Sequence, residues 1–313
     1  FSWVRDYFVD INDGTLETPQ KKRKPYSCDL LISEKCNLRC VKCHFWKSDN
    51  HKSVSFEKCK TIIDSLSRIG DRPFEINFGG GEPLLVDRIV ELIAYAVKKG
   101  LNPALSTNAT LITRQMAKKL ARSGLSRLSI SLDSLDEKTH DTITGVHGSY
   151  KKVMQAFQHL AEYWKTGQIN IHTVLSACNI DSVVDLVEWV NNHDLISGIN
   201  IQAVSQPFRS APLGEWHKTD EYSFLWPSDS AKVNALLDKV IELKKAGYKV
   251  INPLHQFDVY KIYYAHPERF ARKFRCNFGD HTININALGL MHLCCFMKPL
   301  GSLDLSTIEE LWL

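Results

Sequence analysis

The chain has 313 residues, of which 44% are hydrophobic, and this is enough to bury one large core with a smaller appendage. Its formal net charge of +4 is small for that length, so the composition does not favour nucleic-acid binding, and we interpret the basic tract at 21–24 as a solvated surface segment. The sequence contains no apolar run of about 20 residues and no signal-peptide pattern, which argues against membrane spanning and secretion. We therefore expect a globular protein of the reducing cytoplasm.

The order of the predicted elements defines the expected fold. Short apolar segments predict strands at 28–33, 73–79, 102–107, 126–132, 168–176 and 198–204. Amphipathic segments predict helices at 55–69, 86–99, 113–123, 149–165, 181–194 and 229–246. Such alternation requires a parallel sheet with right-handed crossovers, and six units close only part of a barrel. The sequence thus predicts an α/β fold: a partial (β/α)6 TIM-like barrel followed by a small C-terminal β-hairpin and helix.

Three parts are expected along the chain. We assign residues 1–26 to an N-terminal extension, 27–250 to the partial barrel and 251–313 to the small C-terminal domain. Within the barrel, the segment 206–228 carries prolines and two tryptophans and interrupts the helical pattern. It is interpreted either as a lid that faces the substrate or as an ordinary packed loop with two buried indoles.

The first predicted strand is followed by Cys36, Cys40 and Cys43 in the spacing C-x3-C-x2-C. One short loop with this spacing can supply thiolates to three irons of a cubane cluster and leave the fourth iron for an external chelating molecule. The alternative is structural zinc with His44 as the fourth ligand, but two adjacent residues seldom bind one tetrahedral ion together. The spacing therefore favours an iron–sulfur cluster that acts on a bound cofactor at the end of a strand.

The remaining cysteines divide into two kinds. The chain has nine cysteines, and six of them lie at 36–43 and 276–295. In a reducing compartment this grouping favours metal ligation over disulfides. Cys28, Cys59 and Cys178 stand apart inside apolar patterns, and we interpret them as buried or partly buried structural thiols.

The second predicted strand ends in Gly80, Gly81, Glu82 and Pro83. The glycines permit close approach of the backbone to a ligand, and the acid can accept a hydrogen bond from an ammonium group. Together with the cysteine loop on the preceding strand, this element resembles the radical S-adenosylmethionine (radical SAM) superfamily over most of the first 205 residues. The resemblance implies that these four residues bind the methionine part of S-adenosylmethionine.

The same resemblance implies the cofactors and the chemistry. A 4Fe-4S cluster would be coordinated by the three cysteines and by the amino and carboxylate groups of S-adenosylmethionine. One electron from the reduced cluster would cleave a sulfur–carbon bond, and the resulting 5′-deoxyadenosyl radical would abstract a hydrogen atom from a substrate carbon. We expect an enzyme of the oxidoreductase, transferase or lyase type, supplied with electrons by a partner such as flavodoxin or ferredoxin.

Two further strand ends carry residues that the family would place around the cofactor. By resemblance, Ser106, Thr107 or Asn108 would face the ribose or the carboxylate, and Ser131 and Asp133 would line the same cavity. Without the resemblance, each is a polar residue at a strand end.

The sequence departs from the family pattern beside the third cysteine. The residue before this cysteine is usually aromatic in the superfamily, and here it is Lys42. His44, Phe45 or Trp46 are alternative sources of a ring for the adenine. The adenine contacts are therefore left unassigned.

Near the C-terminus, an alternating strand at 282–286 and the strand after it predict a β-hairpin with cysteines at both ends. With the helical pattern at 307–312, this block resembles the SPASM or twitch extension, which binds auxiliary 4Fe-4S clusters. The resemblance gives Cys276 and Cys294 as ligands and Cys295 as a candidate third. We expect one auxiliary cluster; free thiols on the hairpin are the alternative. Either the sequence is clipped, or this site is incomplete or completed by substrate.

The expected substrate is a small molecule or a separately delivered peptide in natural-product or cofactor biosynthesis. Candidate residues near it, by placement at strand ends and loops, are Asp133, His172, Gln202, His255 and Cys178. The Cys178 thiol could return a hydrogen atom to a substrate radical. The rival is a non-catalytic iron–sulfur electron-transfer protein on the same fold, against which Glu82 argues, since an electron carrier needs no ammonium-binding strand end.

Overall fold

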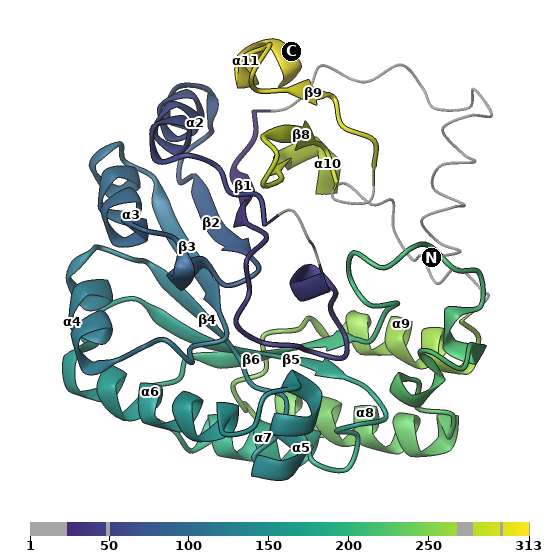
Figure 1. Ribbon diagram of the computed structural model, residues 1–313. Helices are drawn as coiled ribbons and strands as arrows, with labels where there is room; N and C mark the ends of the chain where they lie inside the picture. Colours follow the sequence, from purple (N-terminus) through teal and green to yellow (C-terminus); the bar gives the residue numbers. More distant parts are fainter. Residues whose placement is uncertain (1–23, 48–50, 268–277, 295–296, 313) are drawn as a thin grey trace.

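Parallel strands form the centre of the fold (Figure 1). The computed structural model describes residues 24–47, 51–267, 278–294 and 297–312. In chain order the strands are β1 (Ser27–Ser33), β2 (Glu75–Gly80), β3 (Asn102–Thr107), β4 (Arg127–Ser131), β5 (Gln168–Leu175), β6 (Gly198–Ala203), β7 (Thr282–Ile285), β8 (Leu290–His292) and β9 (Gly301–Ser302). They form one sheet in the order β6-β5-β4-β3-β2-β1-β7-β8-β9. Neighbours are parallel from β6 to β7 and antiparallel from β7 to β9.

The described α-helices pack around this sheet. They are α2 (Phe56–Ile69), α3 (Ile89–Lys98), α4 (Arg114–Arg122), α5 (Glu137–Thr144), α6 (Ser149–Tyr163), α7 (Val183–Asn191), α8 (Ser230–Lys245), α9 (Leu254–Ala265), α10 (Phe278–His281) and α11 (Ile308–Trp312). In Figure 1, α2, α3, α4, α6, α7 and α8 follow an arc around the strands. Within the described ranges, no helix is both long and apolar enough to cross a membrane.

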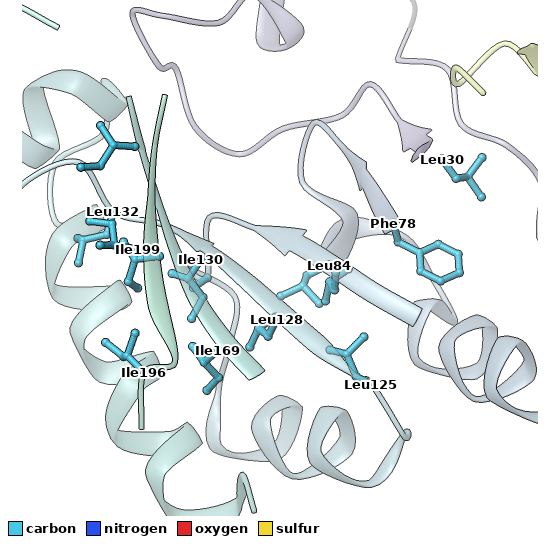
Figure 2. Packing of buried hydrophobic residues seen from close by; sticks show 14 of the residues in the cluster. Leu30, Phe78, Leu84, Leu125, Leu128, Ile130, Leu132, Ile169, Ile196 and Ile199 are labelled. Atoms are coloured by element: carbon cyan, nitrogen blue, oxygen red, sulfur yellow. The ribbon is translucent and has the colours of Figure 1, made fainter. Parts of the chain in front are cut away.

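The two faces of the sheet differ in chemistry, because successive side chains of a strand point to opposite faces. On the outer face, buried apolar side chains such as Leu30, Phe78 and Leu128 pack between the strands and the helices (Figure 2). The opposite face, which we call the inner face, carries polar side chains such as Asn77 and Ser129. The hydrophobic core therefore lies outside the sheet, and the inner face is polar.

The predicted fold class is confirmed as an α/β fold with an open sheet that forms a partial barrel. Each predicted barrel strand and helix overlaps an observed element. Among the described α-helices, α5, α9 and the single-turn α10 were not predicted. The first is short and polar and begins after Asp136, whose side chain accepts a hydrogen bond from the amide of Thr139 at 2.7 Å. The second has no clear apolar stripe, so the helical period was not visible in its sequence.

The predicted C-terminal hairpin is present as β7 and β8, and it joins the barrel sheet. Strand β7 pairs in parallel with β1, from Ser27 opposite Thr282 to Leu30 opposite Ile285. This pairing was not predicted, because a parallel partner from the other end of the chain leaves no local signal in the sequence. Helix α11 lies against α2, so the C-terminal elements extend the packing of the barrel.

The segment 206–228 packs as a loop against the core. Trp216 is 4% exposed, and the ring of Trp226 lies 5.7 Å from it and 5.2 Å from the ring of Tyr263 on α9. The amide of Ala177 after β5 donates to the carbonyl oxygen of Leu225 at 2.9 Å. These contacts agree with the packed-loop interpretation.

Candidate active site at the carboxyl ends of the strands

A cavity of about 210 Å³ lies at the carboxyl ends of the parallel strands. The cysteine loop after β1 lines it together with groups from the ends of β2, β3 and β4. Of the predicted site residues, the lining contains Cys36, Cys40, Cys43, Gly80, Gly81, Ser106, Thr107, Asn108, Ser131 and Asp133. Parallel strands end at one edge of a sheet, which is why residues far apart in the sequence meet here.

Two glycines let the cysteine loop lie directly on the end of β2. The amide of Gly81 donates to the carbonyl oxygen of Ser33 at 2.8 Å, and the amide of Glu82 donates to that of Lys35 at 2.7 Å. A Cβ on Gly81 would lie 2.1 Å from the Lys35 oxygen. Gly80 has a φ of +122°, and a Cβ there would lie 2.3 Å from the Ser33 oxygen. A side chain at either position would displace the cysteine loop.

Glu82 is fully buried and holds β2 to the end of β3. Its Oε1 accepts hydrogen bonds from Thr107 Oγ1 at 2.6 Å and from the amide of Leu84 at 3.0 Å, and its Oε2 accepts one from the amide of Asn108 at 2.8 Å. Burial raises the pKa of this carboxyl group, and the three hydrogen bonds oppose that rise. The cavity lining includes neither Glu82 nor Pro83, so an ammonium contact for the Glu82 side chain stays a prediction.

Lys42 lines the cavity and forms an ion pair with Asp133. Asp133 is 2% exposed, and its Oδ1 also accepts a hydrogen bond from the amide of Val174 at 3.1 Å. The amide of Asp133 donates to Nδ1 of His140 at 3.5 Å, and burial lowers the pKa of this histidine. The ion pair therefore ties the cysteine loop to β4 and β5 and compensates a buried carboxylate.

Two aromatic rings from the cysteine loop contribute to the cavity wall. Phe45 and Trp46 are lining residues, and Nε1 of Trp46 donates to the carbonyl oxygen of Cys40 at 3.3 Å. His44 is not among the lining residues, and its ring lies 5.8 Å from that of Tyr222. Of the three rings considered for the adenine, Phe45 and Trp46 are therefore the two that border the cavity.

The loop before α8 is bound to the cysteine loop, a contact that the sequence analysis missed. The amide of His44 donates to the carbonyl oxygen of Phe208 at 2.8 Å, and the amide of Phe208 donates to that of Lys42 at 3.3 Å. Arg209 forms an ion pair with Glu34, which is 4% exposed. No sequence motif marks these residues, since the contact depends on how a long loop returns over the strand ends. The loop before α8 thus helps to position the cysteines.

The three thiols fit a cluster better than a single metal ion. In the described residues, no three His, Cys, Asp or Glu side chains converge on a point where one ion would bind, as structural zinc requires. In a cubane cluster each thiolate takes a different iron, so its ligands border a cavity without converging. Burial raises the pKa of Cys36, Cys40 and Cys43, to about 12 for Cys40, so thiolate ligands at these positions would need a bound cation to stabilise them.

The other candidates for contact with substrate lie at different depths. Cys178 lies just beyond β5, and its half-buried thiol is 4.0 Å from the carbonyl oxygen of Phe224. Burial raises the pKa of this thiol. His172 and Gln202 lie on β5 and β6, and His255 is exposed on α9. None of these four candidates is among the lining residues of the cavity.

The remaining cysteines agree in part with expectation. Cys28 and Cys59 are fully buried in the core, as predicted. Of the expected auxiliary-cluster ligands, Cys294 is partly buried just after β8. Cys276 and Cys295 lie outside the described residues.

Comparison with known protein families identifies the class. The profile of the Radical SAM superfamily matches residues 30–190, a little over half of the chain. That segment holds the cysteine loop and the strand ends that line the cavity. The chain belongs to the radical SAM superfamily.

Two curated relatives match part of the chain. It is 34% identical over 168 residues to the AdoMet-dependent heme synthase of Nitratidesulfovibrio vulgaris, which covers 51% of this chain and 44% of that protein. It is 35% identical over 150 residues to the mycofactocin maturase MftC of Mycolicibacterium smegmatis, which covers 47% of this chain and 36% of that protein. The chain thus spans less than half the length of these two relatives.

A solved structure matches nearly the whole chain. Streptococcus suis SuiB bound to S-adenosylmethionine aligns with a TM-score of 0.68 and 16% identity, over 98% of this chain and 69% of that one. SuiB bound to the precursor peptide SuiA aligns with the same TM-score of 0.68, at 17% identity, over 98% of this chain and 68% of that one. At this level of identity the likeness shows the fold.

Proposed function

We propose that this chain is a radical SAM enzyme that acts at a carbon atom of a peptide or small-molecule substrate in natural-product or cofactor biosynthesis. The observation that carries the proposal is the single cavity shared by Cys36, Cys40, Cys43 and the polar ends of three neighbouring strands. Cys36, Cys40 and Cys43 would hold a 4Fe-4S cluster there, which would supply one-electron cleavage of S-adenosylmethionine and so allow abstraction of a hydrogen atom from the substrate.

The chain's own residues would bind and orient the cofactor. Gly80 and Gly81 present bare backbone to the cavity, which suits the methionine amino group. The hydroxyl of Thr107 donates to Glu82 and accepts from the amide of Ala109 at 3.0 Å, so one lone pair is left to accept a hydrogen bond from ribose. The side chain of Asn108 lines the same wall.

The other wall would shield the reaction from water. Phe45 and Trp46 offer apolar ring surface for the adenine. Lys42 and Asp133 neutralise each other, so the wall beside the cysteines presents a compensated pair. Exclusion of water protects a reactive radical from side reactions. The Cys178 thiol would then serve as hydrogen-atom donor if the product forms by return of hydrogen to carbon, and Cys178→Ala with unchanged product and stereochemistry would eliminate that role.

A second, auxiliary 4Fe-4S cluster forms part of the proposal, with Cys276 and Cys294 as ligands and Cys295 as candidate third. The hairpin of β7 and β8 supports it, since the observed hairpin lies between the first of these cysteines and the other two. Electrons would come from a small reducing partner such as flavodoxin or ferredoxin.

The test is anaerobic reconstitution followed by a count of iron and sulfide and an assay for reductive cleavage of S-adenosylmethionine to 5′-deoxyadenosine. We expect roughly eight irons per chain, four per cluster, and cleavage activity. The variant Cys36→Ala/Cys40→Ala/Cys43→Ala should lose about four irons and all cleavage. Cys59→Ala, which changes a core cysteine on α2, is the matched control and should keep both. About four irons without cleavage in the unaltered chain would favour the electron-transfer protein instead.

A further inference from the structure

A set of polar side chains on the inner face of β4, β5 and β6 makes no hydrogen bonds within the described chain. We call this set the inner polar cluster. Its members are Ser129, Ser131, Asn170, His172, Asn200 and Gln202. Polar side chains on central strands are normally paired with one another or with the backbone, so their free state requires an explanation.

The sheet register brings these side chains into contact distance. Ser129 lies opposite Asn170, and Ser131 lies opposite His172. His172 in turn lies opposite Asn200. Paired residues on neighbouring strands point to the same face, about 5 Å apart. Gln202 follows one pleat further along β6, toward the carboxyl end. The set therefore forms one continuous surface.

At its carboxyl end this surface is open, and there it continues the cofactor cavity. Ser131 is itself a lining residue of that cavity. Ser131 and Gln202 are exposed and His172 and Asn200 are half-buried, whereas Ser129 and Asn170, further from that end, are buried. In the described residues, the side-chain polar atoms that are fully buried without a partner belong to His193, Asn234 and Glu309, so those of the inner polar cluster all reach open space.

The inner polar cluster is uncharged. It consists of hydroxyl, carboxamide and imidazole groups, each of which can donate and accept hydrogen bonds. Burial, helped by the charge of Arg127, lowers the pKa of His172 to about 4, so its imidazole is neutral at pH 7. Among the described residues, two cations beside this surface are paired with acids: Arg127 Nη2 lies 2.5 Å from Glu75 Oε1, and Lys42 pairs with Asp133.

We infer that the inner polar cluster is a substrate subsite that binds the main chain of an uncharged peptide segment, placed beside the cofactor cavity; this inference rests on the proposed function. Main-chain amides present one donor and one acceptor per residue, which is the complement of carboxamide and hydroxyl groups. The surface from β4 to β6 spans two strand spacings, about 10 Å, which corresponds to about three residues of extended chain. A polyanionic substrate such as a nucleoside triphosphate or a tetrapyrrole carboxylate would require unpaired cations instead.

The probe is a mixture of pentapeptides that are acetylated at the N-terminus, amidated at the C-terminus and limited to uncharged side chains. The reconstituted protein with S-adenosylmethionine is incubated with this mixture, with GTP or with iron coproporphyrin III, and the retained molecules are identified by affinity selection and mass spectrometry. We expect retention of peptides in preference to both polyanions. Preferential retention of either polyanion, or no retained peptide, would overturn the inference.

Variants locate the subsite. Gln202→Ala and His172→Leu should each lower the affinity for the retained peptides about 10-fold, which is the effect of one lost hydrogen bond in a partly desolvated site. His159→Leu on α6, outside the sheet, should leave binding unchanged. Unchanged binding in both test variants would contradict the inference. Iron content and melting temperature show that each variant is folded, and Gln202, being exposed, makes no core contact that its loss could disturb.

The same samples separate this inference from the proposed function. Cleavage of S-adenosylmethionine is assayed without peptide, so it reports the cofactor site alone. Cleavage without peptide binding would refute the subsite and leave the enzyme class standing. Peptide binding that depends on Gln202, without cleavage of S-adenosylmethionine, would support the subsite and refute the proposed enzyme activity.

Discussion

On the inner face of strands β1 to β3, polar side chains such as Asn77 and Ser106 bond to one another, whereas the inner polar cluster on β4 to β6 bonds to nothing in the described chain. Asn77 donates to Oδ1 of Asp29 at 3.0 Å, and Ser106 donates to Oδ1 of Asn77 at 3.1 Å. At the end of the same strands, Glu82 accepts three hydrogen bonds. The inner polar cluster, from Ser129 to Gln202, has no such bonds.

This difference shows that one part of a sheet can stabilise the fold while another part of the same sheet keeps its polar groups for a ligand. The β1 to β3 half, which we call the satisfied half, is stabilised by hydrogen bonds between its own inner-face side chains. The β4 to β6 half, which we call the unsatisfied half, lacks these internal hydrogen bonds, and the donors and acceptors of its inner polar cluster stay available to a ligand. Binding sites commonly lose some stability in this way. The predictions that follow test whether the two halves differ in stability as this contrast requires.

The largest effect is expected at Glu82. Glu82→Ala leaves Thr107 Oγ1 and the amides of Leu84 and Asn108 without their buried acceptor, so the free energy of unfolding should fall by about 4 kcal/mol. Urea denaturation of the apo protein measures it. Glu82→Gln keeps one acceptor oxygen, so its free energy of unfolding should lie between those of Glu82→Ala and the unaltered chain. A loss below about 1 kcal/mol would show that water replaces the carboxylate and that this half is not self-sufficient.

The second effect depends on pH and arises in the unsatisfied half. The pKa of His172 is about 4 in the folded chain, against about 6.5 when unfolded, because burial and the facing Arg127 disfavour its charged form. The unfolded state therefore binds more protons between these values, so stability is full above about pH 6.5 and is lost as pH falls toward 4, by up to about 3 kcal/mol.

The measurement compares the free energy of unfolding of the unaltered chain and of His172→Gln between pH 7 and pH 4. The variant has no titrating group here, so it should match the unaltered chain at pH 7 and lose less stability at pH 4. His159→Gln on α6 is the control and should follow the unaltered chain throughout. If the free energy of unfolding of His172→Gln fell with pH in parallel with that of the unaltered chain, the imidazole of His172 would be hydrated in the folded state.

Sequence reasoning recovered the parts of this arrangement that follow from local pattern. The cysteine spacing, the glycines after β2 and the polar ends of β3 and β4 could be placed together, since parallel strands end at one edge. The alternation of the inner face is also legible in 168–173, Gln-Ile-Asn-Ile-His-Thr, where every second residue is polar.

What the sequence did not reveal depends on long-range geometry. The ion pairs of Lys42 with Asp133 and of Arg209 with Glu34 join residues with no pattern in common. Glu82 was expected to contact the ligand, and the structure shows its carboxylate bonded to Thr107 at the end of β3. No sequence motif distinguishes these two roles. Whether a polar residue on a strand is satisfied by its neighbours depends on register, so the contrast between the two halves required the structure.

The smallest effect gives the most direct comparison, because it uses matched positions in the two halves. Asn77 on β2 and Asn200 on β6 are half-buried asparagines on the same inner face of one sheet. Asn77→Ala removes a donor to Asp29 and an acceptor for Ser106 and should lower the free energy of unfolding by about 2 kcal/mol, whereas Asn200→Ala removes no bond and should change it by less than about 0.5 kcal/mol. Urea denaturation of both apo variants measures the difference. Equal losses would show that Asn200 is bonded through ordered water, and the β4 to β6 half would then be a structural surface like its neighbour.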